Sequence, residues 1–416
     1  AIKSLMALII IIFLSWVVRT TRAYTTECYR DASHLDAPCA CGPTCQFCGA
    51  PFASAGPDAV PTYHLMSQRG CGENDPNGPV FDPYHGVFHH FYQAHLAAPG
   101  GTGPVYGHFV SKDLVQWAEL PVAIWNGLEI TLEQEEVETT TQETPYDTMA
   151  IYTGSAAVIE GAAPDGGRGV VQIYPGLCAK EKFSQCETGT LLAQAAPADY
   201  AGDPLLEVWR KLASNPIVNN TQRDPSSPWR TPDGEWRLRT YDSKIYAAPS
   251  DANLLDGTNW AEVGVADTLR TCECPSLYAL PRVLSLDDDD DQLITKPSPW
   301  ITNATTLPTH VHKTSCDGQD WWQVGTYRYG APGDVGTFVA TPGWEDLFAP
   351  RIVDAGQYYA SKDAAYPPAF PALDTTTTRS GDSHTERRVN WGWAQVPPSS
   401  AQSLPREITF NPRART

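Results

Sequence analysis

After residue 60 the chain alternates short runs of apolar and aromatic residues with turns rich in Gly, Pro and Asp. Runs of this kind, bounded by turn residues, are typical of β-strands, and they include Val87–Gln93, Ala150–Ile159, Gly169–Tyr174, Trp236–Tyr241 and Trp321–Tyr327. No long stretch of this region repeats its apolar residues with the period of an amphipathic helix. The pattern therefore predicts an all-β fold built from many short strands.

Three carboxylates stand beside proline within this pattern. They are Asp75 in the segment Asn74–Gly78, Asp224 in Arg223–Pro225 and Glu273 in Cys272–Pro275. Proline fixes φ and lacks a backbone donor, so it is found where strands begin rather than inside them. Three acids held in this way at the starts of strands predict one convergent pocket. Each acid taken alone is better explained as a turn residue that caps a proline loop.

A series of segments, in the order in which they occur along the chain, resembles the motifs of glycoside hydrolase family 32, the invertases and fructan hydrolases. Besides the three acid segments, the series comprises Gly107–Trp117, Tyr152–Ser155, Asp320–Tyr327, Tyr358–Lys362, Arg387–Trp393 and Leu404–Glu407. One such motif would be a weak signal. The whole series, spread from His64 to Arg406 in the family's order, is a strong one.

The resemblance implies that residues 61–416 form a five-bladed β-propeller, with the acids at the mouth of its central channel. Five sheets are consistent with the strand-leading motifs, which recur at Asp75, Gly154, Asp224, Glu273 and Ala360. Members of the family usually carry a C-terminal β-sandwich after the propeller. Because this chain ends shortly after Leu404–Glu407, we expect that sandwich to be absent from it.

By resemblance, Asp75 is the nucleophile, Glu273 the acid/base and Asp224 a transition-state stabiliser that holds fructose hydroxyls. Retaining hydrolysis needs one carboxylate to attack the anomeric carbon and another to protonate the leaving oxygen and then activate water. We expect backbone N–H donors of the turn to keep Asp75 ionised. The Cys, Pro and Leu residues around Glu273 predict less polar surroundings, which suit a proton donor. Arg223 is expected to keep Asp224 charged.

The resemblance also implies substrate-binding residues. They are Asn74 and Gln93, which would bind fructose hydroxyls, Trp117, Tyr152 and Thr153, which would line the pocket, and Arg223, which would lie beside it. Ordinary packing is the alternative for each of them.

One departure from the family concerns specificity: Gly72-Glu73 stands in place of Trp-Met before the Asn-Asp-Pro, which removes an aromatic wall on the leaving-group side.

The formal net charge of −19 argues against a nucleic-acid partner, because affinity for nucleic acid depends on Lys and Arg that neutralise phosphates. It suits a protein that acts on a neutral small-molecule sugar such as sucrose or fructan. Several histidines lie close together in sequence, but no cluster of Cys, His and Asp completes a ligand set. We therefore expect no metal and no cofactor. The sequence contains no signal for an oligomeric state.

The N-terminal region predicts export. Residues 1–23 contain the apolar run Leu5–Val18, which is short for a bilayer span and typical of a signal peptide; an uncleaved signal anchor is the alternative. Residues 24–60 form a Cys-rich extension, in which disulfides are favoured over a zinc site. The predicted location is secreted or extracellular, with a vacuolar or signal-anchored protein as the alternative.

Eleven cysteines suit an oxidising compartment, and their odd number leaves one unpaired. Cys178 and Cys186 bracket a short polar stretch and are a candidate disulfide. Cys274, beside Glu273, is the candidate free thiol. Sequons for N-glycosylation begin at Asn219 and Asn303, with plain surface loops as the alternative.

Taken together, the residues and the resemblance predict a β-fructofuranosidase that hydrolyses terminal β-fructosides of sucrose or fructan with retention of configuration. Two alternatives stay open. A fructosyltransferase would use the same residues with a sugar acceptor in place of water. A non-catalytic sugar-binding relative would be favoured by loss of one of the three acids, and all three are present.

Overall fold

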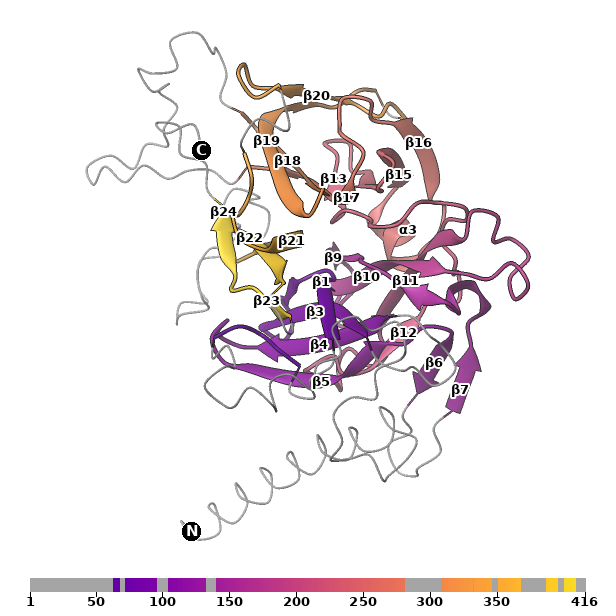
Figure 1. The fold of residues 1–416 in the computed structure, drawn as a ribbon. Helices are drawn as coiled ribbons and strands as arrows, with labels where there is room; N and C mark the ends of the chain where they lie inside the picture. The colour runs from indigo at the N-terminus through magenta and orange to yellow at the C-terminus, as the bar shows by residue number, and fades with distance from the viewer. Residues whose placement is uncertain are drawn as a thin grey trace.

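The computed structural model describes residues 63–67, 72–95, 104–131, 140–280, 308–331, 333–345, 351–367, 387–395 and 400–408. Five antiparallel sheets of four or five strands lie around a common axis (Figure 1). The prediction of an all-β, five-bladed propeller is therefore confirmed. The predicted signal peptide or anchor and the Cys-rich extension lie outside the described residues. Within those residues, no helix is long and apolar enough to cross a membrane.

The blades follow one another along the chain. The first comprises β1 (Gly72–Pro76), β2 (Val80–Asp82), β3 (Val87–His95), β4 (Val105–Ser111) and β5 (Trp117–Ile124). The second comprises β8 (Ala150–Ile151), β9 (Ser155–Glu160), β10 (Arg168–Leu177), β11 (Thr190–Pro197) and β12 (Trp209–Lys211). Between them lie a two-stranded sheet and a 3-10 helix, namely β6 (Leu128–Thr131), β7 (Thr140–Glu143) and η3 (Pro145–Asp147).

The remaining three blades have four strands each. The third comprises β13 (Trp229–Arg230), β14 (Trp236–Arg239), β15 (Lys244–Ala248) and β16 (Ala261–Val265), with the helix α3 (Asp251–Asp256) before its last strand. The fourth comprises β17 (Glu273–Ala279), β18 (His310–Cys316), β19 (Gln319–Arg328) and β20 (Thr337–Ala340). The fifth comprises β21 (Tyr358–Tyr366), β22 (Arg387–Ala394), β23 (Ala401–Gln402) and β24 (Arg406–Ile408). The predicted strand runs thus coincide with β3, β8 and β9, β10, β14 and β19.

The ring closes where the N-terminal described residues meet the fifth blade. Leu65 forms a bridge with Gln402, whose backbone N–H donates to the Leu65 carbonyl at 2.8 Å. Ser400 Oγ accepts from the Glu73 backbone N–H at 3.4 Å and donates to the Glu73 carbonyl. Residues that precede the first blade therefore extend the fifth, which covers an otherwise open sheet edge.

The core lies between the blades, because the sheets bury both of their faces. Successive side chains of a strand point to opposite faces, and β3 illustrates the result. Phe88 and Tyr92 belong to a buried cluster with Trp391 of the fifth blade, whereas Phe91 belongs to one with Tyr174 of the second. Each large side chain buried in this way contributes roughly 1.5–3 kcal/mol. The packing fixes neighbouring blades, and hence the residues at their inner ends, relative to one another.

A bulge recurs near the start of the inner strands. The register of the antiparallel pairs shifts between Glu73 and Pro76, between Glu273 and Ser276, and between Tyr359 and Lys362. Cys274 and Ala360, which lie inside two of these bulges, have a positive φ of 44° and 53°, and Asp224, which lies before β13, has one of 60°. Bulges and left-handed residues of this kind are frequent at functional sites, where they re-aim side chains.

Candidate active site

The structure brings the three predicted acids together, joined by their neighbours in sequence. The backbone N–H of Cys274 donates to Asp224 Oδ2 at 3.1 Å, and its thiol lies 3.7 Å from Asp75 Oδ2. Arg223 Nη2 donates to Glu273 at 2.6 Å, and its Nε lies 3.7 Å from Asp224 Oδ2. One site therefore receives carboxylates from the first, third and fourth blades.

Asp75 lies in the bulge of β1 and is only partly exposed. Its Oδ2 accepts from Gln93 Nε2 at 3.3 Å, from the Thr153 hydroxyl and from the Cys274 thiol. The expectation of backbone N–H donors was wrong: within the described residues, every hydrogen bond to this carboxylate comes from a neutral side chain. Burial, and then the neighbouring Asp224 and Glu273 charges, raise the pKa of Asp75 to about 7, although the Thr153 hydrogen bond opposes the rise.

The turn after Asp75 is packed closely against the second blade. Gly78 has a φ of 68°, and a Cβ at this position would lie 2.5 Å from the backbone nitrogen of Ala156. Only glycine fits such a turn without displacing its neighbour. The Gly78 carbonyl also accepts from Gln172 Nε2 at 3.1 Å. The turn that the sequence predicts at Asn74–Gly78 is thus held rigidly by β9 and β10.

Asp224 is buried, with 3% of its surface exposed. Burial raises the pKa of its carboxyl, while the positive charges of Lys362 and Arg223 and the Cys274 N–H lower it. The prediction that Arg223 keeps Asp224 charged is therefore confirmed only in part. Arg223 does favour the charged form of Asp224, but its short hydrogen bond is to Glu273.

Glu273 is partly exposed, with 35% of its side chain accessible. Arg223 donates to Oε1, and the Tyr359 hydroxyl donates to Oε2. The expectation of less polar surroundings was wrong, because the side chain is held by a guanidinium and a phenol. Burial, and then the hydrogen bond to Glu273, raise the pKa of Tyr359, so its hydroxyl stays protonated and remains a donor. The guanidinium of Arg223 lies over the ring of Tyr241, 4.6 Å from its centroid.

The predicted substrate-binding residues fall into different settings. The Asn74 carbonyl accepts from Gln402 Nε2 at 2.6 Å, while its buried Oδ1 has no hydrogen-bond partner in the described structure. Gln93 Nε2 and Thr153 Oγ1 lie 2.5 Å apart and both contact Asp75, so they orient that carboxylate. The Tyr152 carbonyl accepts from Tyr106 at 2.8 Å.

Trp117 packs in a different environment from the acids. Its ring meets that of Trp391 edge-on at a centroid distance of 5.4 Å, and both belong to the cluster between the first and fifth blades. Among the described contacts of Trp117, none reaches an acid. Packing between blades therefore accounts for this residue, and its role in lining a sugar pocket stays a prediction.

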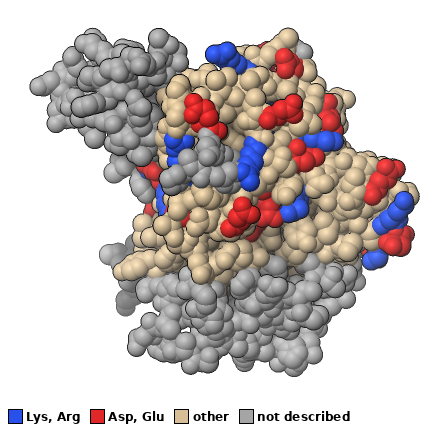
Figure 2. Space-filling model, turned by 45° about the horizontal axis from the view of Figure 1, so that its top comes forward, with Lys and Arg blue, Asp and Glu red and all other residues tan. Residues whose placement is uncertain are grey.

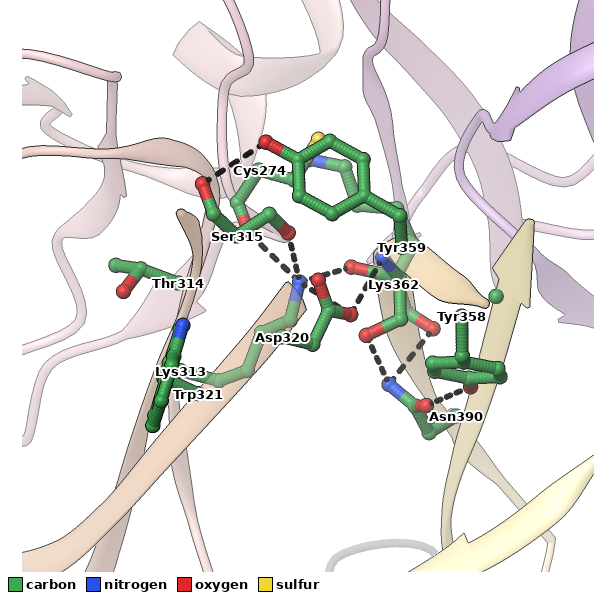
Figure 3. A network of polar contacts seen from close by, with 12 residues as sticks. Cys274, Lys313, Thr314, Ser315, Asp320, Trp321, Tyr358, Tyr359, Lys362 and Asn390 are labelled. Atoms are coloured by element: carbon green, nitrogen blue, oxygen red, sulfur yellow. Dashed lines mark hydrogen bonds and ion pairs between the residues drawn. The ribbon is translucent and has the colours of Figure 1, made fainter. Parts of the chain in front are cut away.

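Four residues near the acids had no assigned role in the sequence: Lys313, Asp320, Tyr359 and Lys362. Figure 3 shows them converging from β18, β19 and β21 beside Cys274. Lys313 Nζ donates to the Cys274 carbonyl at 3.1 Å and lies 3.3 Å from Asp320 Oδ2. The sequence signal for Asp320, Tyr359 and Lys362 was membership of the segments Asp320–Tyr327 and Tyr358–Lys362, and Lys313 had no signal in the sequence analysis.

Two of the predictions about cysteines concern described residues, and both are confirmed. Cys178 and Cys186 form a disulfide, and Cys274 is free and buried, as predicted. A further disulfide, Cys272–Cys316, ties the residue before Glu273 to the end of β18. Burial raises the pKa of the Cys274 thiol, so the group beside Asp75 is a neutral donor. The cysteines of residues 24–60 lie outside the described structure.

The histidines that could suggest a metal are core residues. His89, His90, His108 and His312 are buried, and burial lowers the pKa of each below its usual value. In the described ranges, no group of three or more His, Cys, Asp or Glu is placed to hold a metal ion. On the described surface in Figure 2, acidic and basic side chains are interspersed without a broad basic patch.

Comparisons with known proteins agree with this geometry. The family model of the glycosyl hydrolases family 32 N-terminal domain matches residues 64–414. "Beta-fructofuranosidase, insoluble isoenzyme 4" of Oryza sativa subsp. japonica is 28% identical over 355 residues, which cover 82% of this chain and 50% of that protein. "Fructan 1-exohydrolase" of Hordeum vulgare is 28% identical over 347 residues, covering 80% and 47%. The chain thus spans about half the length of the curated relatives it matches.

A solved structure shows the same architecture. The crystal structure of fructan 1-exohydrolase IIa from Cichorium intybus matches with a TM-score of 0.56 and 25% identity, covering 85% of this chain and 59% of its own. A variant of the Cichorium protein has been solved in complex with 1-kestose.

Proposed function

We propose that this chain, which belongs to glycosyl hydrolase family 32, is a retaining β-fructofuranosidase acting on sucrose or a fructan. The observation that carries the proposal is the difference between the two acids assigned to chemistry. Asp75 is surrounded by neutral donors that leave one oxygen open, whereas Glu273 is accessible and held by Arg223 and Tyr359. A carboxylate with one oxygen free of hydrogen bonds and a second, partly exposed carboxylate beside it are the two groups that a double-displacement reaction uses.

In the first step Asp75 attacks the anomeric carbon of the fructosyl group. The described hydrogen bonds to its carboxylate all fall on Oδ2, so Oδ1 is the oxygen that forms the new bond. The bond from the anomeric carbon to the leaving oxygen breaks, and Glu273 gives its proton to that oxygen. The negative charge that then remains on Glu273 is received by Arg223 and by the Tyr359 hydroxyl.

In the second step Glu273 takes a proton from water, whose oxygen attacks the anomeric carbon and releases Asp75. Two inversions at this carbon give net retention. Asp224 is buried beside the site and is fixed by the Cys274 N–H, so it can hold sugar hydroxyls with little reorganisation.

The substrate class rests on the family and on its named relatives. Both β-fructofuranosidases and fructan exohydrolases resemble the chain at 27–28% identity, so either sucrose or a fructan fits. A fructosyltransferase is the second candidate, because the same three acids would serve when a sugar replaces water. A sugar-binding protein without catalysis is less consistent with three acids that each have defined partners.

The test is incubation with concentrated sucrose, and separately with 1-kestose, followed by chromatography of the products. Free fructose supports hydrolysis, and longer oligosaccharides support transfer. Unchanged substrate, with binding detected by calorimetry, would overturn the proposal in favour of a sugar-binding protein.

We also propose that the protein is exported. The two disulfides in the described structure support an oxidising compartment, as does the apolar run at residues 5–18. N-terminal sequencing of the mature protein tests this: a start near Tyr24 supports cleavage, and a membrane-bound product that retains residues 5–18 contradicts it.

A further inference from the structure

Lys362 is a buried cation to which the steps above assign no task. It lies in β21 with 1% of its surface exposed. Its Nζ donates to the Pro225 carbonyl at 2.8 Å and to Ser155 Oγ at 3.3 Å, and Ser155 Oγ donates to the same carbonyl at 2.7 Å. The ammonium group of the fifth blade is therefore fixed by the second and third blades.

A second buried lysine nearby has different partners (Figure 3). Lys313 Nζ lies 3.3 Å from Asp320 Oδ2 and also donates to the Cys274 and Ser361 carbonyls, at 3.1 and 2.6 Å. By contrast, within the described part of the chain no carboxylate oxygen comes within 4.0 Å of Lys362 Nζ. A buried ammonium without a contacting counter-ion is costly, so more distant negative charges must offset that cost.

The charges that face Lys362 belong largely to the active site. The charged groups that influence it are Asp224, Lys313 and Asp363, and Lys362 in turn acts on Asp75. Burial lowers the pKa of Lys362, and the neighbouring acidic groups oppose this. Conversely, its positive charge lowers the pKa of Asp75 and Asp224 against the burial that raises both.

The hydrogen bonds of Lys362 reach the segments that position both aspartates. Pro225 directly follows Asp224. Ser155 comes two residues after Thr153, whose hydroxyl donates to Asp75. The ammonium group is thus hydrogen-bonded to the segments that carry Asp224 and Thr153, and the fold fixes its position relative to both.

We propose that Lys362 is the buried counter-charge of the two aspartates, a positioning residue that favours the charged forms of Asp75 and Asp224 without touching the sugar. The inference rests on the proposed function, in which both groups act as carboxylates.

The test compares Lys362→Gln with the matched control Lys313→Gln. Glutamine removes the charge of Lys362 but can still donate to the Pro225 carbonyl. For sucrose or 1-kestose, kcat/KM is measured as a function of pH. The apparent pKa of the acid limb of this profile should rise by about one unit in Lys362→Gln. At a pH one unit below the wild-type apparent pKa, kcat/KM should therefore fall about tenfold relative to wild type. Lys313→Gln should have the wild-type apparent pKa of the acid limb, and so should Lys362→Arg, which keeps the positive charge. An unchanged apparent pKa in Lys362→Gln, or an equal rise in Lys362→Gln and Lys313→Gln, would overturn the proposal.

An infrared titration of the Asp75 carboxylate, taken as the difference from Asp75→Asn, provides a readout that does not need turnover. A higher midpoint in Lys362→Gln supports the counter-charge even if no fructoside is cleaved, in which case only the proposed function fails. An unchanged midpoint in an active enzyme means that the role of Lys362 alone is wrong. If Lys362→Gln does not fold, Lys362→Met is the second neutral variant, and the same shift is required of it.

Discussion

Asp75 and Glu273 occupy similar places in the fold but opposite chemical settings. Each lies at a bulge near the start of the inner strand of its blade. Among the described residues, the donors to Asp75 are an amide, a hydroxyl and a thiol, and burial raises the pKa of Asp75 to about 7. Glu273 is partly exposed and is bound by a guanidinium and a phenol.

The bulged inner strands place the two carboxylates in equivalent positions of the fold. Their different hydrogen-bond partners then give them different chemical roles. The donors of Asp75 are neutral and stay in place while its charge is lost and regained during the reaction. The partners of Glu273 are arranged to receive a negative charge when its proton leaves. Predictions that exchange or remove these partners test whether the two acids are distinct.

The largest effect is expected for Asp75→Asn. An amide cannot form the fructosyl-enzyme, so turnover should fall by at least about 10⁴-fold on every substrate, including aryl fructosides with good leaving groups. Steady-state rates on sucrose and on an aryl fructoside check this. Substantial activity on the activated substrate would show that Asp75 is not the nucleophile.

Glu273→Gln should have a strongly substrate-dependent effect. Loss of the proton donor should slow sucrose cleavage by about 10²–10⁴-fold, while departure of a good leaving group needs little protonation and should be largely spared. Pre-steady-state rates with both substrates separate departure from the later attack of water. Equal losses on the two substrates would contradict the acid assignment and make Asp224 the next candidate.

Tyr359→Phe should have a moderate effect, with Tyr358→Phe as its matched control. A hydrogen bond to a charged group contributes about 1.5–3 kcal/mol, so kcat on sucrose should fall roughly 10–100-fold when the donor to Glu273 is lost. The Tyr358 hydroxyl donates to Asn390 instead, so its removal should change stability more than kcat. Similar kcat values for the two variants would mean that Tyr359 does not support Glu273.

The smallest effect concerns stability. The folded-state pKa of Asp75, about 7, lies above the ordinary value of 3.8, so ionising this group costs the folded state stability as pH rises between these values. Asp75→Asn should therefore raise Tm by roughly 2–4 °C at pH 8 and leave it unchanged near pH 4. Calorimetry at the two pH values checks the sign. A lower Tm at pH 8 would show that the charged form is favoured by folding.

Much of the fold could be predicted from sequence because its signals are local. Alternating runs such as Val87–Gln93 are strands, and proline and glycine mark where inner strands begin. The acids could be found because each stands in such a local motif. Their partners could not, since Tyr359 and Lys362 come from a blade far along the chain.

The errors at the site have the same origin. The sequence around Glu273 is rich in Cys and Pro, but its side chain meets Arg223 and Tyr359 because the third and fifth blades converge on it. The turn around Asp75 offers backbone donors, but the bulge directs the carboxylate to Gln93 and Thr153. The pairing of Cys272 with Cys316 likewise depends on strands that are adjacent only in the fold.

The covalent intermediate tests the central claim most directly. Glu273→Gln, mixed with an aryl fructoside and quenched with acid, should accumulate the fructosyl-enzyme, because the base that activates water for its hydrolysis is gone. Peptide mass spectrometry should find one fructosyl residue on the peptide that contains Asp75, and none on it in Asp75→Asn. A fructosyl group on any other residue, or no adduct despite rapid release of the leaving group, would contradict the assignment of Asp75 as nucleophile and Glu273 as acid/base.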